Sequence, residues 1–124
     1  MYKVADFFCG GGGFSEGFKL AGFEIIFAVD RWQPAVTTHH ANHPNANTRL
    51  DDVIRISNLD EEEFHKIVPD TEIIIGSPPC TSFSNSNKSG KADKSLGIQL
   101  IEAYLKIIAR KPLKKRIIIK TMGF

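Results

Sequence analysis

The chain has 124 residues, 42% of them hydrophobic and 24% charged, which suits one folded domain and argues against disorder. Its formal net charge of +2 gives no sign of a strongly basic, nucleic-acid-binding protein. No apolar run reaches the roughly 18 residues that a membrane span needs. The N-terminus lacks the apolar stretch and cleavage site of a signal peptide, so we expect a cytoplasmic protein.

Apolar runs typical of strands alternate with helical patterns along the chain. The expected strands cover residues 2–8, 24–29, 72–75 and 116–119. The expected helices cover residues 14–21, 34–42 and 98–108, and a loop rich in Ser, Asn, Pro and Gly covers residues 76–94. This alternation predicts an α/β fold with a doubly wound, mostly parallel sheet. Such sheets bind ligands beyond the carboxyl ends of their strands.

Four consecutive glycines, Gly10 to Gly13, close the first expected strand and open the first expected helix. Without Cβ atoms, the backbone lets a ligand lie against it, and the amides at the helix start can donate to an anionic group. The spacing departs from Gly-x-Gly-x-x-Gly, because Ser15 and Glu16 fill the last positions, so a dinucleotide fingerprint is weakly supported. Asp30 ends the next strand, where an acid binds ribose hydroxyls. These features suit any adenosine-bearing cofactor and do not choose among them.

The two cysteines lie in different contexts. Cys80 follows Pro78 and Pro79, which stiffen its loop, and the loop alone is equally consistent with a reactive thiol and an inert surface cysteine. Cys9 lies beside Phe8 at a strand end and is predicted to be a small packing residue. Neither has the spacing of a metal site, and a disulfide is not expected in a cytoplasmic chain.

Charge is distributed unevenly along the chain. Acidic residues crowd positions 51–63, and basic residues crowd positions 106–120. The basic segment is equally consistent with contacts to phosphates and with a solvated helix face.

Together, the glycine run and the Pro-Pro-Cys loop resemble motifs of the cytosine-5 DNA methyltransferase family, and the resemblance spans about residues 4–112. The glycine run is similar to the family's first motif, Asp-x-Phe-x-Gly-x-Gly-Gly followed by Gly. That motif is met here by Asp6, Phe8, Gly10, Gly12, Gly13 and Gly17. Residues 76–84 are similar to the family's nucleophile loop, Pro-Cys-Gln-x-Phe-Ser, with Thr81 in place of Gln.

Three shorter segments extend the resemblance. Residues 29–35 resemble the second motif, with Asp30 where a Glu is commoner for binding the ribose. Residues 51–53 resemble the third, usually Gly-Asp-Ile or Gly-Asp-Val, whose Asp meets the adenine amino group; Asp52 takes that role here. Residues 99–108 resemble the helix that follows the catalytic loop.

The resemblance implies a Rossmann-like fold of the S-adenosylmethionine-dependent methyltransferase type. It also implies methyl transfer to C5 of a cytosine in DNA, as part of a restriction-modification system. Cys80 would be the catalytic nucleophile and add to C6 of a flipped base. The substrate-positioning residues would be Ser77, Pro79 and Ser84. The residues that bind S-adenosylmethionine would be Asp6, Phe8, Gly10, Gly12, Gly13, Asp30, Arg31, Trp32, Asp52, Val53, Pro78 and Leu100.

The resemblance ends after the strand expected at residues 116–119. The family continues with Glu-Asn-Val, whose Glu contacts the target cytosine, whereas this chain continues with Lys120-Thr121-Met122. The Gln-x-Arg-x-Arg segment, the target-recognition region and the final cofactor motif are also absent. We therefore expect residues 1–124 to be the cofactor-binding, nucleophile-bearing N-terminal part of a catalytic domain. On this interpretation the chain alone is an incomplete enzyme that needs a C-terminal subunit or segment.

Three other functions stay open at this point. A tRNA cytosine-5 methyltransferase of the same fold carries motifs that hardly differ from these. A non-catalytic cofactor-binding subunit or remnant would account for the missing Glu and recognition region. A nicotinamide oxidoreductase is the weakest alternative, because it leaves the Pro-Pro-Cys loop unexplained.

Overall fold

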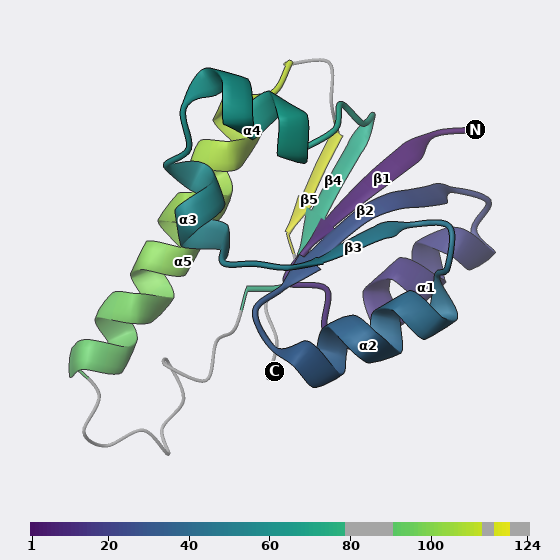
Figure 1. Cartoon of the computed structure of the whole chain (residues 1–124), viewed down its shortest axis with the longest axis horizontal. Coiled ribbons are helices and arrows are strands. Elements are labelled where there is room, and N and C mark those ends of the chain that lie inside the picture. Colours follow the sequence, from purple (N-terminus) through teal and green to yellow (C-terminus); the bar gives the residue numbers. More distant parts are fainter. Residues whose placement is uncertain (79–90, 113–115, 120–124) are drawn as a thin grey trace.

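The computed structural model describes residues 1–78, 91–112 and 116–119, and the side chains of 91–94 and 116–119 are not described. Their strands form one sheet in the order β3-β2-β1-β4-β5, with every pairing parallel (Figure 1). The strands are β1 Lys3–Phe7, β2 Glu24–Asp30, β3 Asn47–Leu50, β4 Ile73–Gly76 and β5 Arg116–Ile119. The chain builds outward from β1 first to one side and then to the other. The switch point of this topology, where ligands bind, therefore lies between β1 and β4.

Helices cover both faces of the sheet, which confirms the expected doubly wound, Rossmann-like fold (Figure 1). One face carries α1 Gly13–Leu20 and α2 Gln33–Asn42. The other carries α3 Val53–Ser57, α4 Glu61–Ile67 and α5 Lys91–Ala109. Among the described residues, no helix is both long and apolar enough to cross a membrane.

The core is divided by the sheet into two apolar clusters, because successive strand residues point to opposite faces. From β1, Ala5 and Phe7 join the cluster under α3, α4 and α5. Val4 joins the cluster on the opposite face, beneath the aromatic residues of α1. Asp6 follows the same alternation and turns toward α1, where it is 1% exposed. A carboxyl group in this position needs hydrogen-bond partners inside the protein.

The expected elements are confirmed where the apolar pattern is strong. The four predicted strands correspond to β1, β2, β4 and β5, and Pro34 lies in the first turn of α2. The edge strand β3 and the short helices α3 and α4 were missed. Both helices begin at an aspartate whose side chain caps them: Asp52 accepts from the Ile54 amide, and Asp60 accepts from the Glu63 amide. Such N-caps are a readable sequence signal.

The loop expected over residues 76–94 is corrected at both ends. Gly76 is the last residue of β4, and the backbone of α5 begins at Lys91, so the helix expected at residues 98–108 is longer than predicted. Residues 79–90 lie outside the described residues.

Candidate functional site

The glycine run forms a tight turn between the carboxyl end of β1 and the start of α1. Gly10 and Gly12 adopt φ angles of 55° and 104°, which favour glycine. The Cys9 amide donates to the Val29 carbonyl, and the Gly12 amide donates to the Cys9 carbonyl. A Cβ added at Gly10 or Gly13 would meet no atom within 4 Å, so their Cα atoms face open space where a ligand can approach.

Asp30, at the end of β2, ties this turn to the next helix. Its Oδ2 accepts from the Gly10 amide at 2.9 Å, and its Oδ1 accepts from the Trp32 amide at 3.0 Å. Each carboxylate oxygen has a second lone pair, so Asp30 can still accept from a ribose hydroxyl. The sequence predicts the ribose contact but gives no hint of the bond to Gly10.

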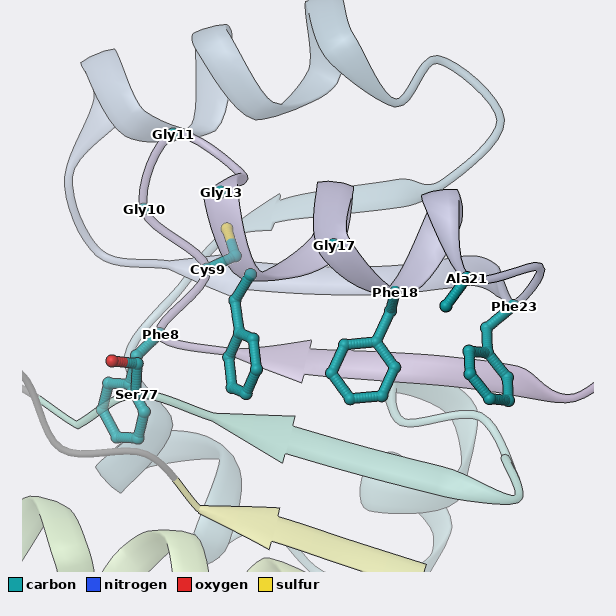
Figure 2. A pocket seen from close by; sticks show the side chains of 11 residues that line it. Phe8, Cys9, Gly10, Gly11, Gly13, Gly17, Phe18, Ala21, Phe23 and Ser77 are labelled. Atoms are coloured by element: carbon teal, nitrogen blue, oxygen red, sulfur yellow. The ribbon is translucent and has the colours of Figure 1, made fainter.

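A cavity of about 600 Å³ opens beside the turn, and Figure 2 shows the side chains that line it. Its walls are Phe8, Cys9, Gly10, Gly11, Gly13, Phe14, Gly17, Phe18, Ala21, Phe23 and Ser77. Ser77 follows β4, so the cavity lies at the switch point between β1 and β4. The Ser77 Oγ is buried and has no hydrogen-bond partner among the described residues. An apolar cavity with a glycine cradle and one orphaned hydroxyl fits a ligand that carries polar groups on an apolar body.

Behind the turn, a buried polar network joins β1, α1, α2 and β3. The Ser15 Oγ lies 2.5 Å from Asp6 Oδ2 and 3.0 Å from His39 Nε2. His39 Nδ1 in turn lies 3.1 Å from the Thr48 Oγ1. Asp6 Oδ1 has no partner among the described residues. Asp6 thus lies beneath the turn and is not part of the cavity wall.

Burial shifts the two titratable groups of this network in opposite directions. It raises the pKa of Asp6 to about 7, with a further rise from the charge of Asp30 and an opposing effect of the Ser15 hydrogen bond. Burial, together with the neighbouring His43, lowers the pKa of His39 to about 4. The imidazole of His39 is therefore neutral at physiological pH, whereas Asp6 is close to half-protonated.

Asp51 and Asp52, in the segment that resembles the family's third motif, have different hydrogen-bond partners. Asp51 accepts from Arg55 Nε at 2.8 Å and from Arg49 Nη2 at 3.0 Å. The Arg55 hydrogen bond holds the pKa of Asp51 well below its usual range. Asp52 caps α3 with one oxygen, which leaves the other for a ligand. Val53 is buried in the core cluster, so only its backbone can reach a ligand.

The remaining predicted site residues differ in their exposure to solvent. Trp32 is 66% exposed next to Asp30, and Arg31 is also exposed. Pro78 is buried, and Leu100 is buried on α5. The catalytic and substrate-positioning predictions Cys80, Pro79 and Ser84 lie outside the described residues.

Cys9 is buried beside the glycine turn, which agrees with its predicted packing role. Burial, followed by the charges of Asp6 and Asp30, raises the pKa of its thiol, so it is a poor nucleophile.

Gly76, just before the Pro-Pro-Cys loop, packs closely against Tyr104. A Cβ at this position would lie 2.6 Å from Cζ of Tyr104, a buried residue of α5. Gly76 therefore allows α5 to pack directly against the end of β4, which fixes where the loop starts.

The described part of the basic segment serves the fold. Arg110 donates to the Ser57 carbonyl and to Glu61, and its guanidinium lies 4.0 Å from the centroid of the Phe64 ring. Lys111 is buried and donates to the Val68 carbonyl at 2.6 Å. Neither of the two alternatives considered for this segment, phosphate contacts or a solvated face, describes these two side chains.

Sequence reasoning missed most of the cavity wall and all of the network beyond Asp6. The aromatic residues Phe14, Phe18 and Phe23 are ordinary core residues by pattern, and only the fold shows that they border a cavity. His39 stands four residues from Ala35, which is also buried, so helical spacing could have identified its inward orientation.

Comparison with known proteins connects this geometry to one family. The sequence model of C-5 cytosine-specific DNA methylases matches residues 2–114. Type II methyltransferase M.HgiGI of Herpetosiphon aurantiacus is 43% identical over 95 residues, which cover 77% of this chain and 70% of that protein. M.HgiDI of the same organism is 41% identical over 77% of this chain and 28% of its own length. A DNA modification methyltransferase encoded within an E. coli prophage has a TM-score of 0.63 and 32% identity over 87% of this chain.

The chain thus aligns with less than a third of two of these proteins, 28% of M.HgiDI and 30% of the prophage enzyme. Within that part, the match runs from β1 through α5 and includes the glycine turn, Asp30 and Asp52. The fold is that of S-adenosylmethionine-dependent methyltransferases. This chain belongs to the C-5 cytosine-specific DNA methylase family.

Proposed function

We propose that residues 1–124 form the cofactor-binding and nucleophile-bearing part of a DNA (cytosine-5-)-methyltransferase of a type II restriction-modification system. The main support for this proposal is the glycine turn at the switch point of the sheet. Asp30 accepts a hydrogen bond from this turn, and Ser77 lines the same cavity. The names of the related proteins, type II methyltransferases, support the same activity.

The described residues suggest how S-adenosylmethionine is held. The amides and bare Cα atoms of the glycine turn would contact its amino-acid end, since no side chain occupies the space in front of them. Asp30 would accept from the ribose hydroxyls, and Asp52 from the adenine amino group. When bound, the cofactor supplies an electrophilic methyl group. The Ser77 hydroxyl, which has no partner among the described residues, would be free to bond a ligand or the target base in the cavity.

The nucleophile of the proposed reaction is the Cys80 thiolate. Its sulfur would form a bond to C6 of the flipped cytosine, which makes C5 nucleophilic enough to take the methyl group. Loss of the proton from C5 and of the thiolate from C6 would then restore the ring. The net change is one hydrogen of the base replaced by one methyl group. The position of Cys80 after Pro78 and Pro79, as in the family's nucleophile loop, supports this role.

Cofactor binding is tested by calorimetry with S-adenosylhomocysteine, the demethylated product. Asp30→Ala should weaken binding by about 1–3 kcal/mol, because a charge-assisted hydrogen bond is lost. Asp60→Ala is the matched control, since Asp60 also accepts a backbone amide at a helix start but lies on α4. Equal affinity of the Asp30→Ala and Asp60→Ala proteins would remove Asp30 from the site.

The covalent step is tested with duplex DNA that carries 5-fluorocytosine. Fluorine cannot leave C5 as a proton does, so the conjugate persists and shifts the protein band on a denaturing gel. The chain is assayed alone and with a polypeptide that carries a family Glu-Asn-Val motif and target-recognition region, and tRNA is assayed in parallel. We expect transfer to DNA in the second mixture and little in the first.

Two cysteine variants then identify the nucleophile. Cys80→Ser should abolish the conjugate, because an alcohol is far less ionised than a thiol at neutral pH. Cys9→Ser should still form it, since the Cys9 thiol is buried and its pKa is raised. The opposite pattern would assign the nucleophile to Cys9 and overturn the proposed mechanism. Methylation of tRNA alone would move the chain to the tRNA branch of the family.

A further inference from the structure

Four polar side chains form a continuous hydrogen-bond chain behind the glycine turn. The chain runs from Asp6 on β1 through Ser15 on α1 and His39 on α2 to Thr48 on β3. Asp6, Ser15 and His39 are all at most 1% exposed, so water does not compete for their hydrogen bonds. None of the four lines the cavity, and the proposed reaction gives them no direct part.

The same network packs against the turn itself. A Cβ at Gly12 would lie 3.1 Å from Cδ2 of His39 and 3.1 Å from Nε2 of His43. The two imidazole rings lie side by side with centroids 4.6 Å apart. The rings therefore support the backbone of Gly12 from beneath, in the φ = 104° conformation that ends the turn. A displacement of His39 would therefore change the space beneath the Gly12 backbone.

We propose that His39 is a positioning residue for the cofactor turn, and that one proton on Asp6 sets the direction of the hydrogen-bond chain from Asp6 through Ser15 and His39 to Thr48. The inference rests on the proposed function, because it takes the turn to be the cofactor site.

The direction follows from the single hydrogen of the Ser15 hydroxyl, which can be donated to only one neighbour. When Asp6 is ionised, Ser15 donates to the carboxylate and accepts from Nε2–H of His39. Nδ1 of His39 is then an acceptor for the Thr48 hydroxyl. When Asp6 is protonated, it donates to Ser15, Ser15 donates to Nε2, and His39 carries its hydrogen on Nδ1 and donates to Thr48. The imidazole changes tautomer without changing charge.

Charged and titratable groups on the elements around this chain influence its ionisation electrostatically, and of these His40 is exposed. They are Cys9 after β1, Glu16 on α1, Asp30 on β2, His40 and His43 on α2, and Tyr104 on α5. Burial, opposed by the Ser15 hydrogen bond and reinforced by Asp30, raises the pKa of Asp6 to about 7. Burial lowers the pKa of His39 to about 4. Between pH 5.5 and 8.5 the network thus changes by one proton, on Asp6, while His39 stays neutral.

The test is a nitrogen NMR titration of the histidine side chains in the complete chain, without cofactor, from pH 5.5 to 8.5. We expect the hydrogen of His39 to move from Nδ1 to Nε2 as the pH rises through about 7. The amide of Gly12 should titrate with the same midpoint, because the His39 ring lies 3.1 Å from the position that a Gly12 Cβ would take. A single His39 tautomer over the whole range, or a Gly12 amide that does not follow it, would overturn the proposal.

Two variants and one control locate the coupling. Ser15→Ala should abolish the tautomer change, since the hydroxyl that links Asp6 to His39 is removed. Asp6→Asn should do the same with the hydroxyl in place, because the side chain no longer titrates. Ser57→Ala is the matched control: Ser57 is also a buried helical serine, but its hydroxyl donates to the Ile54 carbonyl on α3. Retention of the tautomer change in both Ser15→Ala and Asp6→Asn would contradict the proposed coupling of Asp6 to His39 through Ser15.

Calorimetry with S-adenosylhomocysteine tests the positioning role by itself. His39→Leu should weaken binding about tenfold, as expected for a lost buried hydrogen bond, and His39→Gln, which keeps a polar group near the Nε2 position, should restore most of it. His40→Leu, on the exposed side of α2, should bind as the unsubstituted chain does. Equal affinity of His39→Leu would overturn the positioning role. If the unsubstituted chain binds no S-adenosylhomocysteine, the proposed function fails, and the NMR titration still decides whether His39 and Gly12 are coupled.

Discussion

Two buried polar clusters hold opposite ends of the sheet, and they satisfy their polar atoms in different ways. At the carboxyl ends, Asp6, Ser15 and His39 form a hydrogen-bond chain with no buried cation. At the amino ends, Lys111 lies between α5 and β5 and donates to the Val68 carbonyl and to Asp70, just before β4. The Lys111 side chain is 2% exposed, while Asp70 is 67% exposed and brings the opposite charge from the surface.

The Lys111 cluster is suited to stabilising the fold, whereas the network of Asp6, Ser15 and His39 can respond to a change in protonation. The Lys111 ammonium has donors only, so its hydrogen bonds to the Val68 carbonyl, Asp70 and Nδ1 of His65 can run in one direction only. A carboxyl, a hydroxyl and a neutral imidazole have two arrangements that differ by one proton and by direction. The cluster at the amino ends therefore has the properties of a structural contact between α5 and the sheet. The network at the carboxyl ends has the properties expected beside a ligand site.

Removal of the buried ammonium should have the largest effect on stability. Lys111→Ala leaves the Val68 carbonyl without its partner and opens a cavity beside the Phe64 ring. We expect a loss of about 3–4 kcal/mol in the free energy of unfolding, measured by urea denaturation. Lys111→Met keeps the apolar stem and removes the charge, so it separates packing from hydrogen bonding. If Lys111→Ala costs less than about 1 kcal/mol, the cluster at the amino ends is not such a structural contact.

The carboxyl-end network should make two opposing contributions to the pH dependence of stability. The pKa of Asp6 is higher in the folded chain than its ordinary value of 3.8, so Asp6 favours folding more as the pH falls from about 7 toward 3.8. The pKa of His39 is lower than its ordinary 6.5, so His39 disfavours folding as the pH falls from 6.5 toward about 4. Over the shared window the two effects oppose each other.

Single substitutions should expose these opposing effects. Relative to the unsubstituted chain, His39→Gln should gain stability as the pH falls from 6.5 to 4, by up to ~1.4 kcal/mol per pH unit, because only Asp6 then titrates. Asp6→Asn should show the opposite slope over the same window. Urea denaturation at half-unit steps of pH measures both. Parallel pH profiles of all three proteins would mean that the network does not carry these protons.

The sequence predicts the carboxyl-end rim far better than the network behind it. Glycines at a strand end and an acid after the next strand are local patterns, and the structure brings both together at the carboxyl ends of β1 and β2. Asp6 bonds Ser15 on α1, nine positions away, and Ser15 bonds His39 on α2, 24 positions further along, so no local pattern reveals either contact. The missed β3 and α3 are too short for a periodic pattern, with four and five residues. Lys111 shows the same limit, because a basic run does not reveal which member is buried.

A substitution in the turn should connect the network to the ligand site. Gly12→Ala places a Cβ 3.1 Å from both His39 and His43 at a φ of 104°, which should cost about 1–2 kcal/mol of stability. Gly13→Ala is the matched control, since its Cβ meets no atom within 4 Å and α1 begins there. We expect Gly13→Ala to leave urea stability nearly unchanged yet to weaken S-adenosylhomocysteine binding, because the new methyl group lies in the cavity wall. Equal stability losses in the two variants would show that the imidazole rings do not restrain the turn.

The smallest effect is expected at Asp51, whose side chain is 6% exposed but whose partners Arg49 and Arg55 are 33% and 51% exposed and so reach water. Asp51 lies beneath two arginines, and Arg55, which holds its pKa down, is half-exposed. Because the pKa of Asp51 in the folded chain is below its ordinary value of 3.8, its contribution is complete at neutral pH and is lost as the pH falls below about 4. Asp51→Asn should therefore cost about 1 kcal/mol at pH 7, less at high salt, and almost nothing at the lowest pH at which the chain stays folded. Glu62→Gln, which removes an exposed pair with Lys66, should have no measurable effect at either pH. A cost for Asp51→Asn as large as that for Lys111→Ala would show that the exposure of Arg49 and Arg55 does not weaken their bonds to Asp51, and that geometry and not burial sets these costs.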